Sequence, residues 1–188
     1  MRPKDLDKQQ RIKRAMVRLI LREGMSGASV SKIAQEAGVS PATIYVYYTS
    51  KEAMLEEVFR ECSHQSYSFM LRRIRPEMDG RELIDSLVRG YYAYTLEHEE
   101  VFSFVEQCSR CPTLAESFSE EECCCEVFSL LHAYQDRGKL KRVSDPILAA
   151  LLFAPVRYLA MNRQKCAPEP ELLLRELVSM LQGLLLTE

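Results

Sequence analysis

The first fifty residues carry apolar side chains at the spacing of an α-helix, and glycines divide this pattern into short pieces. The first apolar run, at steps of three and four residues, comprises Ile12, Ala15, Met16, Leu19 and Ile20. Gly24 stands where this helix would end, and Ser29 is placed as the N-cap of a second helix that ends at Gly38. Ser40 repeats the start signal for a third helix that reaches about Tyr47. The sequence therefore predicts three helices in its first quarter, two of them very short.

The remaining residues also follow helical spacing, and strand-like alternation is scarce, so we predict an all-α fold. A fourth helix is expected to begin after Ser50 and to continue toward Arg75. The later helices are expected at residues 81–97, 100–108, 112–137, 146–165 and 170–187. Asp145 is a suitable cap, Gly138 follows a helix end, and Pro155 should remove a hydrogen bond and kink the helix that contains it.

Charge is distributed unevenly along the chain. Residues 1–60 contain eleven Lys/Arg and seven Asp/Glu residues, whereas the remaining 128 residues contain 14 Lys/Arg and 20 Asp/Glu residues. A basic head of this kind suits a polyanion. The seven cysteines form no spaced disulfide framework, and no apolar run is long enough for a signal peptide or a bilayer span. We therefore expect a cytoplasmic protein with free thiols and no membrane association.

The two short helices are joined by Ala37-Gly38-Val39-Ser40, a glycine turn that fits a helix-turn-helix. On the second of these helices Ile44 would point inward. The residues left facing outward are Pro41, Ala42, Thr43, Tyr45, Val46 and Tyr47. Three tyrosines lie within four positions of this helix and its end, and phosphate oxygens are natural partners for their hydroxyls. The pattern favours DNA binding.

The stretch SVSKIAQEAGVSPATIYVYYTSKE, residues 29–52, resembles the N-terminal signature of the TetR-type transcriptional regulators. The resemblance covers about residues 8–60, and beyond them only the succession of helices agrees. It implies an Ω-shaped, all-helical homodimer of about nine helices per subunit. A helix-turn-helix domain at residues 1–50 would bind DNA, and residues 51–188 would bind ligand and dimerise through a four-helix bundle.

Carried over by position, the resemblance implies roles for individual residues. Ser29 and Lys32 would approach the operator backbone, and Pro41, Ala42 and Thr43 would face base edges. Tyr45 and Tyr47 would hold phosphates, whereas Tyr48 would pack on the core. Lys51 would contact a phosphate, although it opposes the helix dipole and should be a slight liability without DNA.

The reading helix departs from its relatives at Pro41, Ala42 and Val46, and it contains no Arg, Lys, Asn or Gln. Bidentate recognition of guanine or adenine is therefore excluded from this helix. We predict that specificity comes from Thr43, from contacts of Ala42 and Val46 with thymine methyl groups, and from DNA shape.

The two C-terminal helices are apolar on more than one face and so need partners on several sides. A homodimer would bury them and hold two reading heads one DNA turn apart, about 34–36 Å. The alternative is burial within one subunit. The predicted interface residues are Leu148, Leu151, Leu152, Leu173, Leu177, Met180, Leu181 and Leu184.

Aromatic residues are frequent in the helices between the head and the C-terminus. Most should be core, but some should line a pocket for a small apolar or aromatic effector. The predicted lining residues are Tyr91, Tyr94, Phe104, Cys108, Phe128 and Tyr158. An effector that binds the released form about 10⁴-fold more tightly would switch the protein nearly completely.

The thiols offer a rival sensor. Cys108 and Cys111 form a C-x-x-C, and Cys111 directly precedes Pro112, where a helix N-terminus would lower a thiol pKa. Cys123–Cys125 follow on the next helix. Redox, electrophile or metal sensing by the same fold is one interpretation, and packing as small buried hydrophobes is the other. The spacing gives no matched pairs for zinc, so we predict no metal site and no cofactor.

Other classes of function find little support. The chain has no phosphate-cradling glycine loop, no H-E-x-x-H and no carboxylate pair distinct from solvated charge such as Glu120–Glu122. Catalysis is therefore not expected. A helical interaction module without DNA affinity is the alternative from another class. The preferred prediction is a repressor that leaves a palindromic operator when a small molecule binds.

Overall fold

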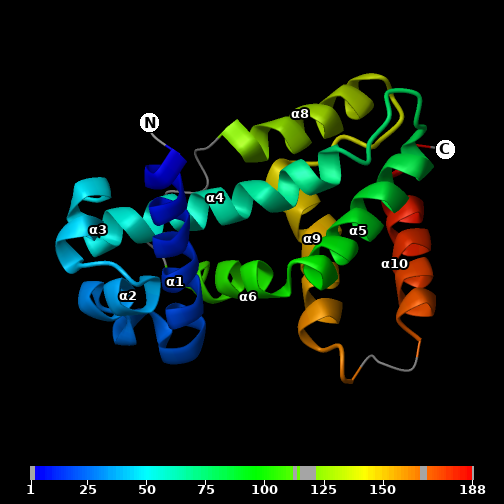
Figure 1. Cartoon of the computed structure of the whole chain (residues 1–188). Helices are drawn as coiled ribbons and strands as arrows, with labels where there is room; N and C mark the ends of the chain where they lie inside the picture. Colours follow the sequence, from blue (N-terminus) through cyan, green and yellow to red (C-terminus); the bar gives the residue numbers. More distant parts are fainter. Residues whose placement is uncertain (1–2, 112–113, 115–121, 166–168, 188) are drawn as a thin grey trace. The chain divides into compact units, whose positions relative to one another are not determined.

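The computed structural model describes residues 3–111, 114, 122–165 and 169–187. Side chains are described from residue 6 in the first range and from residue 126 in the range 122–165. In these ranges the regular structure is helical, apart from an isolated β-bridge between Leu140 and Leu186 (Figure 1). The first helices are α1 (Pro3–Gly27), α2 (Val30–Ala37), α3 (Pro41–Tyr47) and α4 (Lys51–Leu71). The later helices are α5 (Gly80–Glu97), α6 (Glu99–Cys108), α8 (Glu122–Asp136), α9 (Asp145–Met161) and α10 (Pro170–Leu185).

Helical packing divides the chain into two compact units. The N-terminal unit comprises residues 1–63 and 99–120, and the C-terminal unit comprises residues 64–98 and 121–188. The N-terminal unit therefore extends past residue 50 and takes in α6. This division follows packing, and the functional boundary at residue 50 stays a prediction. The expected helix start at Pro112 and the thiols of Cys123–Cys125 lie outside the described residues.

The N-terminal unit has one apolar core. It includes the α1 run that was predicted from the sequence, together with Ile33, Ala34 and Ala37 of α2 and Ile44 of α3. Phe104 of α6 is fully buried in the same core. Gly24 interrupts α1 with φ 77°, a left-handed conformation that glycine adopts without steric cost. The expected end of the first helix at Gly24 is confirmed by this break. A short helical turn that reaches Gly27 follows it before α2 begins.

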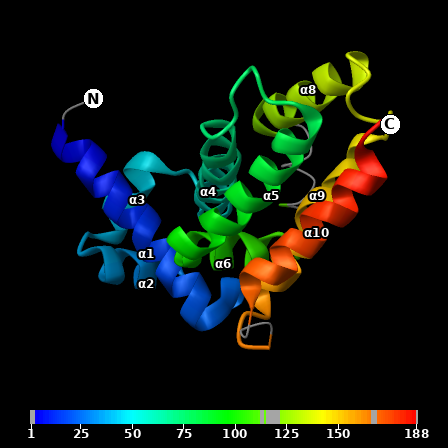
Figure 2. The ribbon, with the colours of Figure 1, turned by 90° about the vertical axis from the view of Figure 1, so that its right-hand side faces the viewer.

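The C-terminal unit is organised around α5, against which both α9 and α10 pack (Figure 2). Asp79 and Glu82 start α5 with a capping box, in which each side chain accepts a hydrogen bond from the other's backbone N–H. The chain end returns to the same unit, since Lys141 N–H donates to the Leu185 carbonyl at 2.8 Å. α4 ends at Leu71 rather than continuing toward Arg75.

The start of α9 corrects one expectation. Ser144, not Asp145, occupies the N-cap position, and Asp145 is the first helical residue. The Asp145 carboxylate instead lies 2.6 Å from a ring nitrogen of His132 on α8, so it links two helices. The helix then continues through Pro155 to Met161.

Candidate nucleic-acid interface

Helix α3 is a seven-residue helix fixed at its start by Ser40. The Ser40 hydroxyl accepts a hydrogen bond from Thr43 N–H at 3.2 Å and shares a second contact with the Thr43 hydroxyl at 2.9 Å. Pro41 fills the first turn without losing a helical hydrogen bond. These caps confirm the helix boundaries that the sequence predicted.

The faces of α3 are sharply divided. Ile44 is buried in the core, whereas Tyr45 and Val46 are 58% and 78% exposed. Pro41 and Ala42 are also exposed. We call Ala42, Tyr45 and Val46 the α3 surface. These three side chains expose apolar and aromatic surface side by side on a seven-residue helix.

The turn before α3 is held by backbone geometry and by one arginine. Gly38 caps α2 with φ 66°, and Val39 N–H donates to the Ala34 carbonyl at 2.9 Å. The Arg11 guanidinium of α1 donates to the Ala37 carbonyl at 3.1 Å, where a cation also complements the helix dipole. Arg11 could not be singled out from the sequence, because its partner is a backbone carbonyl 26 positions away.

The tyrosines at the end of α3 differ from one another. Tyr48 is 4% exposed, as expected, and Gln9 Nε2 donates to its hydroxyl at 3.4 Å. Burial raises the pKa of Tyr48 above its ordinary value. Tyr47 is half-buried against the core, with its ring centre 6.5 Å from that of Tyr48. Of the two tyrosines expected to hold phosphates, Tyr45 is therefore the more accessible.

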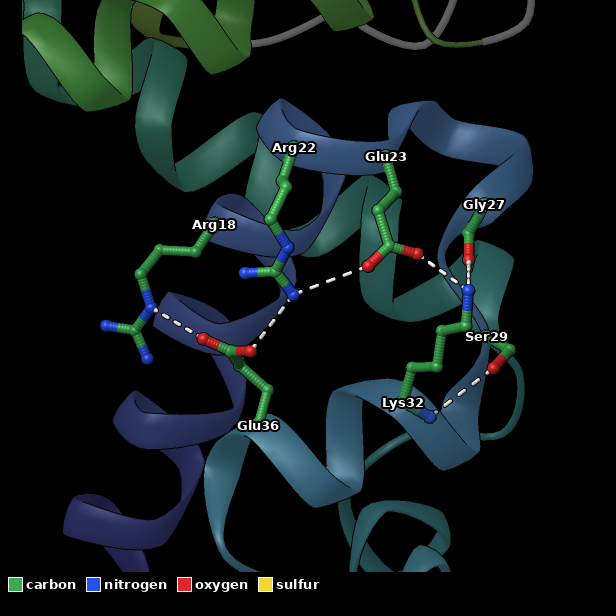
Figure 3. Close-up of polar contacts among 7 residues, drawn as sticks. All are labelled: Arg18, Arg22, Glu23, Gly27, Ser29, Lys32 and Glu36. Atoms are coloured by element: carbon green, nitrogen blue, oxygen red, sulfur yellow. Dashed lines mark hydrogen bonds and ion pairs between the residues drawn. The ribbon is translucent and has the colours of Figure 1, made fainter.

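A chain of alternating charges joins α1 to α2 (Figure 3). Lys32 Nζ lies 2.6 Å from Glu23, and Arg22 contacts Glu23 at 3.4 Å. Arg22 also contacts Glu36 at 3.2 Å, and Arg18 contacts the other oxygen of Glu36 at 3.2 Å. Hydrogen bonds from Lys32 and from Arg22 lower the pKa of Glu23 and of Glu36 respectively, so both carboxylates are ionised at neutral pH. These pairs hold α2 in place against α1.

The two glutamates of this chain were not singled out in the sequence. Glu23 and Glu36 are charged residues on surface helices, and their spacing does not show which cations face them across the two helices. The pairs form because α2 folds back along α1, so the signal is tertiary.

Two lysines that were expected at phosphates bind the corner between α1 and α2. Lys51 Nζ donates to the carbonyls of Met25 and Ala28 at 3.3 and 3.2 Å. Lys32 Nζ donates to the carbonyl of Gly27 at 3.2 Å (Figure 3). The expectation that Lys51 would be a liability without DNA is therefore wrong, because carbonyl oxygens already compensate its charge. Ser29 likewise serves as the α2 cap, accepting a hydrogen bond from Lys32 N–H at 3.3 Å.

A cavity of about 310 Å³ lies within the C-terminal unit, between α4, α5 and α9. Its aromatic wall is formed by Tyr67, Tyr91 and Phe153, and the Phe153 ring meets the other two edge to face at 6.2 and 5.4 Å. Met70 completes this wall and is fully buried. The cavity has the mixed apolar and polar lining of a small-molecule site.

The expected pocket residues do not gather at this cavity. Tyr91 lines it, but Tyr94 is buried against the rings of Phe69 and His98. Phe104 and Cys108 lie in the core of the N-terminal unit, because α6 packs there. Phe128 is half-buried on α8, and Tyr158 is 63% exposed on α9. The sequence could not separate these faces, since the helices carry apolar residues on several sides.

The predicted dimer residues also separate into two groups. Leu148, Leu152 and Leu181 are at most 2% exposed within the single chain, which corrects their assignment to an intersubunit surface. Leu151, Leu173 and Leu177 are half-buried, and Met180 and Leu184 are 66% and 55% exposed. Three further apolar residues of α9 are exposed but were not among the predicted interface residues, and one of them, Tyr158, was expected in the pocket. These are Ile147, Tyr158 and Met161, at 52%, 63% and 52% exposure.

Two thiols of the N-terminal unit, Cys62 and Cys108, are poorly placed for reactivity, whereas Cys111 is half-buried. Burial raises the pKa of Cys62 and of Cys108 to about 12, so neither forms an appreciable thiolate at neutral pH. In the described part of the chain, no three His, Cys, Asp or Glu side chains gather as metal ligands would. Among the same residues, none of the helices combines the length and apolarity that crossing a bilayer requires.

Comparisons with known proteins agree with the helix-turn-helix. The family described as "Bacterial regulatory proteins, tetR family" matches residues 12–58. An uncharacterised HTH-type transcriptional regulator of Haemophilus influenzae is 26% identical over 156 residues, which cover 80% of each chain. The family match ends within α4, so it covers the elements that position α3.

Solved structures extend the likeness over the whole fold. A TetR family transcription regulator from Marinobacter aquaeolei is 26% identical, with a TM-score of 0.84 and full coverage of both chains. The transcriptional regulator FadR of Bacillus subtilis, solved in complex with stearoyl-CoA, is 24% identical with a TM-score of 0.71, covering 90% of this chain and 97% of its own. These relatives are regulators of transcription.

Proposed function

Because the chain belongs to the TetR family of transcriptional regulators, we propose that it is a homodimeric repressor that a small molecule releases from operator DNA. The observation that supports this most is the α3 surface, which stands exposed on a glycine turn and is braced by Arg11. A short helix presented in this way fits the major groove.

Recognition of bases would rest on small and apolar groups. Ala42 and Val46 are exposed, and Thr43 is half-buried with its hydroxyl bonded to Ser40. Thymine methyl groups are the apolar feature of the major groove, so a site rich in thymine at the contacted positions is expected. Pro41 would approach the same base edges, and Tyr45 and Tyr47 would reach the flanking phosphates.

Phosphate contacts would come from the α1–α2 corner. Ser29 and Lys32 are exposed there. Lys51 is half-buried, and its ammonium group uses two of its three N–H donors on carbonyls. The third donor would serve a phosphate that lies beside the corner. Each such contact adds to affinity without distinguishing sequences.

Dimerisation would bury the exposed face of α9 and α10. We define the α9–α10 stripe as Ile147, Leu151, Tyr158 and Met161 together with Leu173, Leu177, Met180 and Leu184. Within each helix these residues recur at three, four or seven positions, so they share one face. A second copy would cover both faces in a four-helix bundle and set the spacing of the two α3 helices.

The cavity of the C-terminal unit would hold the effector. Its volume of about 310 Å³ lies at the lower end for small-molecule sites, and its wall is aromatic. A compact apolar or aromatic molecule fits these properties. FadR, which shares the fold, was solved with a small-molecule ligand, stearoyl-CoA. The raised pKa values of Cys62 and Cys108 do not favour these two thiols as a sensor.

A mobility-shift series tests the proposed function. The DNA that flanks the gene for this chain is offered to the purified full-length protein over a range of salt concentrations. The proposal expects binding that weakens linearly in log–log form as salt increases, and that prefers this fragment over a scrambled duplex. Equal weak binding to both fragments, or none, would favour the interaction module without DNA affinity.

A further inference from the structure

The ammonium group of Lys32 is engaged by two groups of its own chain. Glu23 Oε2 lies 2.6 Å from Nζ, and the Gly27 carbonyl accepts at 3.2 Å (Figure 3). The Lys32 side chain is nonetheless 52% exposed, and that of Glu23 is 31% exposed. A phosphate that approaches Lys32 therefore meets a cation with a carboxylate at hydrogen-bonding distance.

Glu23 is held close to Lys32 from two directions. Arg22 contacts its other oxygen at 3.4 Å, and Gly24 breaks the helix immediately after it. Hydrogen bonding from Lys32 lowers the pKa of Glu23, so the carboxylate stays charged at the pH of DNA binding. A phosphate on the same ammonium group would lie near this negative charge, and the two anions would repel each other.

We infer that Glu23 competes with DNA phosphate for Lys32 and so lowers the affinity of the N-terminal unit for any duplex, whatever its sequence. This inference rests on the proposed DNA binding. The Glu23 carboxylate acts as an internal counterion. A phosphate contact at Lys32 therefore replaces the ion pair between Lys32 and Glu23. Such an exchange releases fewer salt ions from the DNA than a contact by an unpaired lysine would.

Glu36 provides a matched control within the same network. It has the same charge, a similar side-chain exposure of 26% and two cationic partners, Arg18 and Arg22. Both of these partners are cations of α1. Neutralising Glu36 therefore removes one negative charge from the same surface and leaves the Lys32 pair intact.

The test is a double-mutant cycle on DNA affinity. Glu23→Gln, Lys32→Met, the pair of both and Glu36→Gln are titrated by fluorescence anisotropy with one non-specific duplex, between 50 and 200 mM salt. Glu23→Gln should steepen the log–log salt slope by about one unit, so its gain in DNA affinity at 50 mM salt should exceed its gain at 200 mM about fourfold. Glu36→Gln should raise affinity with a smaller change of slope.

The outcome in the Lys32→Met background decides the mechanism. In that background Glu23→Gln should raise DNA affinity no more than Glu36→Gln does, because no lysine remains that Glu23 could occupy. An unchanged slope in Glu23→Gln, or a full gain without Lys32, would overturn the inference. Circular dichroism verifies folding of each variant, and Glu23→Ala replaces Glu23→Gln if the amide disturbs the helix. Wild-type protein that binds no duplex would overturn the proposed function as well, whereas wild-type binding with an unchanged slope would overturn the inference alone.

Discussion

The α3 surface and the α9–α10 stripe are both exposed and apolar, and they differ in length and in neighbours. The α3 surface lies on a helix of seven residues, and α1 and α2 of the same unit carry the paired charges of Arg18, Arg22, Glu23, Lys32 and Glu36. The α9–α10 stripe is spread over helices of 17 and 16 residues. The first is small and belongs to a charged unit, whereas the second is long and regularly spaced.

The difference indicates two kinds of partner. A polyanion with thymine methyl groups in its groove can satisfy a small apolar surface and nearby cations together. A long apolar face without charges among its own residues is matched best by an identical face, as in a coiled bundle. The predictions below test whether the two surfaces have separate partners, from the largest expected effect to the smallest.

The largest effect should come from charges placed in the stripe. Met180→Glu combined with Leu184→Glu should convert the dimer to a monomer, because each interface would bury four uncompensated carboxylates. Loss of the second reading head should then weaken operator binding roughly 10²–10⁴-fold. Light scattering and anisotropy on the same samples measure both effects.

Arg175→Glu is the control for added negative charge on α10. Arg175 is exposed, and helical spacing places it on the side away from Met180 and Leu184. The Arg175→Glu substitution should leave the dimer intact. A dimer that survives the double substitution in the stripe would show that α9 and α10 are not the interface.

A smaller effect is expected from a charge on the α3 surface. Val46→Glu should weaken DNA binding about a hundredfold, or by about 3 kcal/mol, because a carboxylate would face phosphates across the groove. The dimer and the melting temperature should not change, since Val46 is 78% exposed. Gln65→Glu, an exposed site in the C-terminal unit, makes the same charge change elsewhere. Equal loss in both variants would mean that the α3 surface has no special role.

The smallest effect concerns acid. Hydrogen bonds from Lys32 and Arg22 lower the pKa of Glu23 and Glu36 below the ordinary 4.5. Their contribution to stability is therefore complete above pH 4.5 and is lost as the pH falls through the lowered values. The melting temperature of the wild type should exceed that of Glu23→Gln/Glu36→Gln at pH 6, and the gap should narrow toward pH 3. A gap that widens in acid would contradict these ion pairs.

The helix boundaries of the helix-turn-helix could be predicted from the sequence, because short-range interactions determine them. Ser29, Gly38 and Ser40 end or begin helices by bonds to residues three or four positions away, so each signal is contained in a few residues. The inward direction of Ile44 and the burial of Tyr48 follow from the same helical period. These parts of the candidate site needed no tertiary information.

The remaining features depend on packing between distant segments. Leu148 and Leu181 face their own core, whereas Met180 and Leu184 face outward, and an apolar helix offers no periodicity that separates the two groups. The partners of Lys51 are backbone carbonyls more than twenty positions away, which no residue type announces. Phe104 was assigned to the effector pocket because nothing in its sequence places α6 in the N-terminal unit.

Photocrosslinking from each surface tests the separation of partners most directly. Benzoylphenylalanine replaces Val46 in one variant and Met180 in another, and both are irradiated with the operator fragment present. The account predicts a protein–DNA adduct from position 46 and a covalent protein dimer from position 180. Protein dimers from position 46, or DNA adducts from position 180, would contradict it.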